Sequence, residues 1–187
     1  MDTEIVYTRT VKNITLSAEE DLIQRARLRA AKEKRTLNAA FRDWLQRERA
    51  NESSQVLTEE DREALTVLDS EGWWQDPHRL DAAREPLMRA AAWYFLRARN
   101  KRGTPVDSVA RFHLGNGARL ERLNWLADTS ERALRQSFGL MVNYLYDLAD
   151  IEKNHEAYAQ QRTIAAASAV TRLARTAQAR DVVPAEA

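Results

Sequence analysis

The chain has 187 residues, of which 44% are hydrophobic and 30% charged, so it has room for one ordinary domain or two small ones around a packed core. It has no cysteine and only three histidines, which excludes disulfides and thiolate metal sites, and we expect no metal. No apolar run approaches the roughly 20 residues that span a bilayer, and the N-terminus lacks a signal-peptide pattern. We therefore expect no membrane association and a cytoplasmic location.

The first fifty residues predict a strand followed by two helices. Residues 9–16 alternate in the manner of a short strand, and Ser17 with Glu20 forms a capping box that begins a helix. Thr36 begins a second helix, whose apolar residues recur at helical spacing: Leu37, Ala40, Phe41, Trp44 and Leu45. A lone strand leaves its edges unpaired and fifty residues bury little surface, so we expect this unit to form a twofold homodimer.

Residues 12–17 and 36–45 resemble the ribbon-helix-helix family of antitoxins and repressors. In that family two strands form an antiparallel ribbon in the major groove of DNA. The resemblance implies a DNA partner, with three residues facing base edges and two nearer the phosphates: Val11, Asn13 and Thr15, then Arg9 and Lys12. The alternative is a segment that only dimerises, in which Asn13 and Thr15 are ordinary exposed strand residues.

Residues 51–56 lose the apolar periodicity and are interpreted as a linker. We therefore expect one module over 1–50, a second domain over 57–180 and a disordered tail over 181–187. The second domain begins with a helix capped by Thr58, with Asp61 three residues later, and a further helix is expected to follow Pro86.

The rest of the second domain predicts alternating helices and strands. In chain order we expect a helix capped by Asp107, a strand over 118–125, a helix capped by Ser130, a strand over 140–146 and a final helix within 164–179. Mixed strands and helices make this part a helix-rich α+β domain.

One histidine lies in a glycine-rich stretch, residues 111–119, which reads Arg-Phe-His-Leu-Gly-Asn-Gly-Ala-Arg. This is His113, and Tyr144 and Tyr146 lie on the strand predicted nearby. An imidazole and a phenol can transfer or polarise a proton together. From the residues alone, His113 is more typical of a structural histidine, and Tyr146 of a core aromatic.

The stretch 111–125, with 128–130 and 139–146 behind it, closely resembles the C-terminal part of malonyl-CoA decarboxylase. The resemblance runs from about Leu57 to about Ala169. It implies a partial acetyltransferase-like (GNAT-type) fold, malonyl-CoA as substrate, acetyl-CoA and carbon dioxide as products, and no metal or organic cofactor. It also implies that His113 and Tyr146 are catalytic.

The family's catalytic serine and glutamate lie in an earlier segment, which the residues before Leu57 do not resemble. We therefore expect a decarboxylase-related protein whose isolated chain is inactive unless a partner supplies these groups. Two alternatives stay open. One is a dimeric DNA-binding regulator or antitoxin with a non-catalytic C-terminal part, and the other is a rearranged gene that joins an antitoxin start to a truncated decarboxylase.

Overall fold

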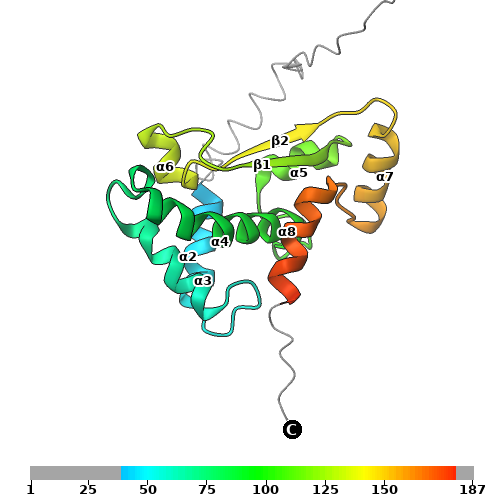
Figure 1. Ribbon diagram of the computed structural model, residues 1–187. Coiled ribbons are helices and arrows are strands. Elements are labelled where there is room, and N and C mark those ends of the chain that lie inside the picture. Colours follow the sequence, from blue (N-terminus) through cyan, green and yellow to red (C-terminus); the bar gives the residue numbers. More distant parts are fainter. Residues whose placement is uncertain (1–38, 180–187) are drawn as a thin grey trace, which may run out of the picture.

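The computed structural model describes residues 39–179 (Figure 1). The strand and first helix of the expected ribbon-helix-helix module, with Arg9, Val11, Lys12, Asn13 and Thr15, lie outside the described residues. The described elements are, in order, α2 (Ala39–Ala50), α3 (Glu59–Ala64), the 3-10 helices η1 (Leu65–Asp69) and η2 (Trp73–Gln75), α4 (Pro77–Leu96), α5 (Ser108–Gly115), β1 (Arg119–Asn124), α6 (Glu131–Ser137), β2 (Met141–Leu145), α7 (Ile151–Gln161) and α8 (Ser168–Ala179). This is a helix-rich α+β architecture, as the sequence predicts.

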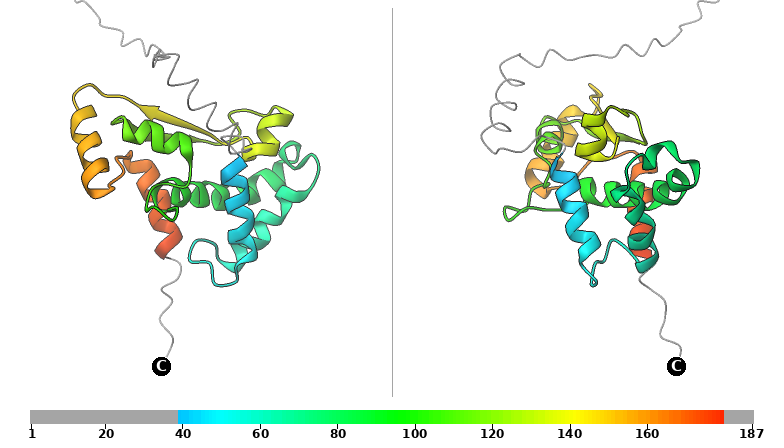
Figure 2. Two further views of the ribbon diagram at one scale, coloured as in Figure 1. Left: turned by 180° about the vertical axis from the view of Figure 1, so that it is seen from behind. Right: turned by 90° about the vertical axis from the view of Figure 1, so that its left-hand side faces the viewer.

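Helix α4 crosses the middle of the molecule. It packs against α2 and α3 on one side and against α8 on another, while the two strands lie across one end of this helical layer (Figures 1 and 2). Within residues 39–179, no helix is both long enough and apolar enough to span a membrane.

The start of α4 differs from the prediction. The helix begins at Pro77 and contains Pro86, which was expected to mark its beginning. Asp76 caps the helix by accepting a hydrogen bond of 2.9 Å from the backbone N–H of His78, and a proline at the first helical position is preset for helical geometry. Pro86 stays inside because it is buried in the core, where packing offsets the backbone hydrogen bond that proline cannot make.

Aromatic rings join α2 to α4. Trp44 stacks on Trp93 with ring centroids 5.8 Å apart, and Phe41 meets Tyr94 edge-on at 5.2 Å. Phe41 is 3% exposed and Leu45 is completely buried. Helix α2 was expected to belong to a separate N-terminal module, but its apolar face lies in the same core as α4.

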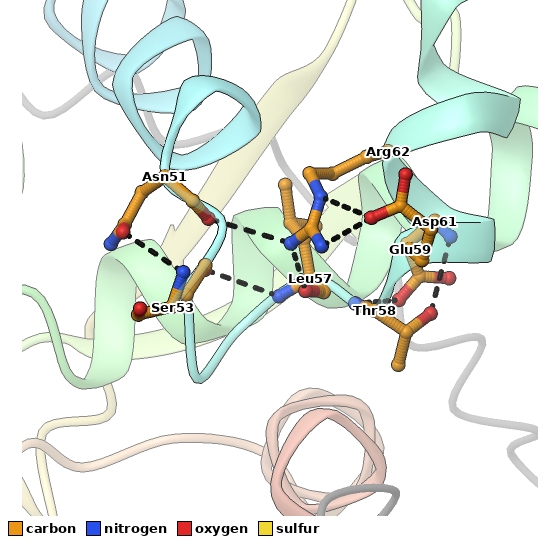
Figure 3. Close-up of polar contacts among 8 residues, drawn as sticks. Asn51, Ser53, Leu57, Thr58, Glu59, Asp61 and Arg62 are labelled. Carbon is orange, nitrogen blue, oxygen red and sulfur yellow. Dashed lines mark hydrogen bonds and ion pairs between the residues drawn. The ribbon is translucent and has the colours of Figure 1, made fainter.

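Hydrogen bonds from Arg62 and a capping box hold the loop between α2 and α3 in place (Figure 3). The Arg62 guanidinium donates to the backbone carbonyls of Leu57, at 3.0 Å, and Asn51, at 3.4 Å. Thr58 and Asp61 form the expected capping box, in which each side chain accepts from the other's backbone N–H. The stretch 51–56, expected as a linker between two domains, therefore connects two helices of one core.

A second contact ties α2 to α6. The Arg42 guanidinium donates to the carbonyl of Arg135 at 2.7 Å and to that of Leu134 at 3.3 Å, and it lies 4.4 Å above the ring of Phe138. Both residues lie in the last turn of α6, where a cation interacts favourably with the negative end of the helix dipole, although the Leu134 carbonyl also accepts from the Phe138 N–H at 3.1 Å.

The sheet pairs β1 with β2 in antiparallel register, with Leu120 opposite Tyr144 and an irregularity between Leu120 and Arg122. On its other side β1 meets a short extended segment. There the Leu120 N–H donates to Ala165 and the Ala167 N–H donates to Leu120, both at 2.9 Å. Both strands were predicted, and their pairing brings Tyr144 and Tyr146 toward α5.

Candidate functional site

Helix α5 carries the candidate histidine and begins at a buried carboxylate. Asp107 accepts a hydrogen bond of 2.8 Å from the backbone N–H of Ala110, which confirms its predicted role as the helix cap. Burial raises the pKa of Asp107, and the backbone N–H groups of Ala110 and Val109 offset part of that rise. The start of α5 is thus fixed in the protein interior, which sets the direction in which the helix presents His113.

His113 contacts both tyrosines of the β2 segment. Its Nδ1 lies 2.9 Å from the hydroxyl of Tyr146, within hydrogen-bonding distance. Its ring stacks on Tyr144, with centroids 4.4 Å apart and planes 16° from parallel. The structure therefore brings together the two residues that the sequence analysis selected, His113 and Tyr146, which are 33 positions apart in the chain.

The surroundings favour the uncharged forms of these side chains. Burial lowers the pKa of His113, because desolvation disfavours the imidazolium. Burial likewise raises the pKa of Tyr146, and the polar side chain of Asn116 opposes part of that rise. The pKa of Tyr144 is raised well above its ordinary value, first by burial and then by the charge of Asp107. A neutral imidazole and a phenol therefore face each other at neutral pH.

The turn after α5 is held by helix α7. The Gly117 backbone has φ +81°, and a Cβ at that position would lie 2.2 Å from the carbonyl oxygen of Ile151, so only glycine fits without rearrangement. The Asn154 amide donates to the Gly117 carbonyl at 3.2 Å. On the other side of Asn116, His155 Nδ1 donates to the Gly115 carbonyl at 2.6 Å.

Two parts of this site were missed in the sequence analysis. Helix α7 was not predicted, although Ile151 and Tyr158 are seven positions apart, the spacing of one apolar face of a helix. Asn116 was quoted only as part of a motif. Its role depends on the backbone turn between Gly115 and Gly117, which residue types alone do not reveal.

The site has the means to move a proton, and it contains no grouping of metal-binding side chains. In the part of the chain that the structure describes, no three His, Asp or Glu side chains are close enough together to hold a metal ion. A neutral imidazole whose second nitrogen is engaged by a phenol can donate to or accept from a reacting atom.

Comparison with known proteins places the chain in a family. The family model described as "Malonyl-CoA decarboxylase C-terminal domain" matches residues 22–183. Mitochondrial malonyl-CoA decarboxylases of Anser anser anser and Rattus norvegicus are 41% and 40% identical over 120 and 123 residues, 64% and 65% of this chain. Crystal structures of malonyl-CoA decarboxylase from Rhodopseudomonas palustris and Agrobacterium vitis are 52% and 45% identical to it, with TM-scores of 0.70 and 0.69 over 72% and 81% of the chain.

The fold, which matches these two crystal structures with TM-scores of 0.70 and 0.69, thus defines a domain of the malonyl-CoA decarboxylase class. The chain belongs to the malonyl-CoA decarboxylase C-terminal domain family. It spans about a quarter of the two animal relatives (24% and 25%) and 31% and 39% of the two bacterial structures. The family match begins at residue 22, earlier than the position near Leu57 where the resemblance was expected to start, and it includes α2.

Proposed function

We propose that this chain acts in the decarboxylation of malonyl-CoA to acetyl-CoA and carbon dioxide, and that His113 and Tyr146 supply the proton. The observation that carries the proposal is the 2.9 Å contact between His113 Nδ1 and the Tyr146 hydroxyl, within the region that matches the family. The catalytic roles of the two residues are our inference from this contact and from the resemblance of their motifs.

The chemistry needs a proton donor late in the reaction. When the bond between the malonyl α-carbon and its carboxylate breaks, carbon dioxide leaves and the electron pair remains as the enolate of the thioester. The α-carbon must then gain one proton to give acetyl-CoA. An enolate carbon is basic enough to take that proton from an uncharged imidazole N–H, and neutral histidines act on enolates in other enzymes.

The electrostatics of the site agree with this role. Burial lowers the pKa of His113, so the ring is neutral at neutral pH and keeps one N–H. With Nδ1 engaged by Tyr146, the atom left to face a substrate is Nε2. The stack on Tyr144 holds the plane of the ring.

The test is a chimera, because the chain spans only part of its relatives. The aligned region of the Rhodopseudomonas palustris enzyme is replaced by this chain, and acetyl-CoA formation from malonyl-CoA is measured beside the same chimera carrying His113→Ala. We expect turnover that falls by a factor of about 10² to 10⁴ in the variant, the usual contribution of a general acid. A folded chimera whose rate does not depend on His113 would contradict the proposal.

DNA binding is not advanced as a second function. The five residues expected to contact DNA lie outside the described residues, and the apolar face of α2, assigned to the ribbon-helix-helix module, is buried against α4. The homodimer, the DNA partner and the acetyltransferase-like architecture stay predictions.

A further inference from the structure

We propose that Asn154 and His155, two neighbours on helix α7, are positioning residues for His113. Their side chains hold the turn that follows His113, and α7 itself begins shortly after Tyr146, so they set the distance between the imidazole and the phenol. The proposal rests on the proposed function for its chemical purpose, but the position of the ring is measurable without turnover.

The two side chains bind one turn, residues 115–117, at the end of α5, and α7 lies beside that helix (Figure 1). The Asn154 amide donates to the Gly117 carbonyl at 3.2 Å, and His155 Nδ1 donates to the Gly115 carbonyl at 2.6 Å. A carbonyl oxygen only accepts hydrogen bonds, so His155 carries a proton on Nδ1. The turn is therefore held from α7 at two of its three carbonyls.

The same turn is bonded to the backbone of His113. The N–H groups of Asn116 and Ala118 both donate to the His113 carbonyl, at 3.2 and 3.1 Å. Helix α5 has only eight residues, and its other end is fixed at the Asp107 cap. A shift of the turn therefore changes the direction in which α5 presents the imidazole.

Helix α7 is also joined to the residue that meets this imidazole. The N–H groups of Asp150 and Ile151 donate to the Asp147 carbonyl at 2.9 and 3.0 Å, so α7 starts from a closed turn that directly follows Tyr146. One helix is thus connected to Tyr146 through the backbone and to the turn behind His113 through two side chains. The 2.9 Å contact between the imidazole and the phenol depends on both connections.

Steric contact and hydrogen bonding restrain the turn in opposite directions. A Cβ at Gly117 would lie 2.2 Å from the carbonyl oxygen of Ile151, so the backbone there cannot come closer to α7. Asn154, three residues further along α7, keeps the same residue from moving away. This precision matters for catalysis, because a misplacement of about 1 Å can cost a rate factor of about 10².

The experiment is proton NMR of the full-length chain, with the His113 signals assigned by their loss in His113→Gln. The Tyr144 ring shields a stacked neighbour, so the His113 ring protons should lie upfield of those of an exposed histidine. Asn154→Ala should move them toward the exposed position, while α7 is kept because alanine favours a helix more than asparagine does. Gln160→Ala removes an exposed amide from the same helix and, as the matched control, should leave them unchanged.

His155→Ala is the second variant, because an exposed side chain can be removed without unfolding the protein. It should move the His113 signals in the same direction as Asn154→Ala, by a smaller amount. Unchanged signals in either variant, once folded, would overturn the proposal, and so would an equal shift in Gln160→Ala.

Turnover of the chimera connects the position of the ring to chemistry. Asn154→Ala should lower kcat by a factor of about 10 to 10² with little change in KM, and it should cost nothing further once His113 is replaced by alanine. A similar loss in that His113→Ala background would contradict a role through His113. If the chimera's rate does not depend on His113 at all, the proposed function fails, while the NMR result still decides whether α7 positions the ring.

Discussion

Two regions of the molecule are stabilised in different ways. One is the helical region from α2 to α4, and the other surrounds α5, β2 and α7. In the first, large aromatic rings such as Phe41 and Trp44 are almost completely buried and pack on one another. In the second, His113 and Tyr146 are only partly buried and are held by hydrogen bonds and by a glycine turn. The comparison shows that most of the apolar stabilisation lies away from the residues suited to chemistry, so substitutions in the two regions should have separable effects.

The largest stability effect is expected in the aromatic core. Phe41→Ala should lower the free energy of unfolding by about 3 to 5 kcal/mol, because a buried ring is removed and a cavity is left beside Tyr94. Chemical denaturation monitored by tryptophan fluorescence measures this loss. A loss below about 1 kcal/mol would mean that α2 is not part of this core.

The next largest effect is a loss of stability caused by a substitution within the candidate site. Gly117→Ala should cost about 1 to 3 kcal/mol, since alanine is strained at positive φ and its Cβ would collide with the carbonyl of Ile151. Gly103→Ala is the matched control, having a similar φ of +70° but open space around it. Equal losses in the two variants would show that α7 does not press on the turn.

A smaller effect concerns pH. Because burial lowers the pKa of His113, the unfolded state gains its proton first as the pH falls, and this group's contribution to stability is lost from its ordinary value of about 6.5 downward. Proton NMR of the full-length chain should show His113 titrating below that ordinary value. Titration at or above it would contradict the neutral pair.

The smallest effect is expected at an exposed ion pair on α6. Glu131 and Arg135 contact each other, but both side chains are more than half exposed, so water screens them. Glu131→Gln should change the free energy of unfolding by no more than about 0.5 kcal/mol in the same denaturation experiment. A larger loss would mean that this pair stabilises α6 more than its exposure to water predicts.

Elements marked by short-range signals were predictable from the sequence. Three helix starts were predictable because an N-cap depends on only a few neighbouring residues. The caps are Thr58 with Asp61, Asp107, and Ser130. The first strand was predictable from alternation and the second from its aromatic and β-branched residues, and the interest in His113 and Tyr146 came from the resemblance of their motifs.

Features that depend on long-range packing were not predictable. A proline usually marks the start of a helix, so the sequence predicts a start at Pro86. Its place inside α4 depends on burial in the complete core, which the neighbouring residues do not reveal. Residues 51–56 were expected to separate two domains. The contact between Phe41 and Tyr94, more than fifty positions apart, instead joins the helices on both sides of this stretch, and local sequence does not reveal it. Helix α7 was not predicted because no side chain caps its first turn.

The most direct test of the account is a double-mutant cycle in the chimera, with kcat for malonyl-CoA measured for His113→Ala, Tyr146→Phe and the two combined. If the residues act as one unit, Tyr146→Phe should cost about tenfold alone, as for one hydrogen bond, and nothing further once His113 is absent. If instead the two losses multiply, Tyr146 acts independently of His113 and the central claim is wrong.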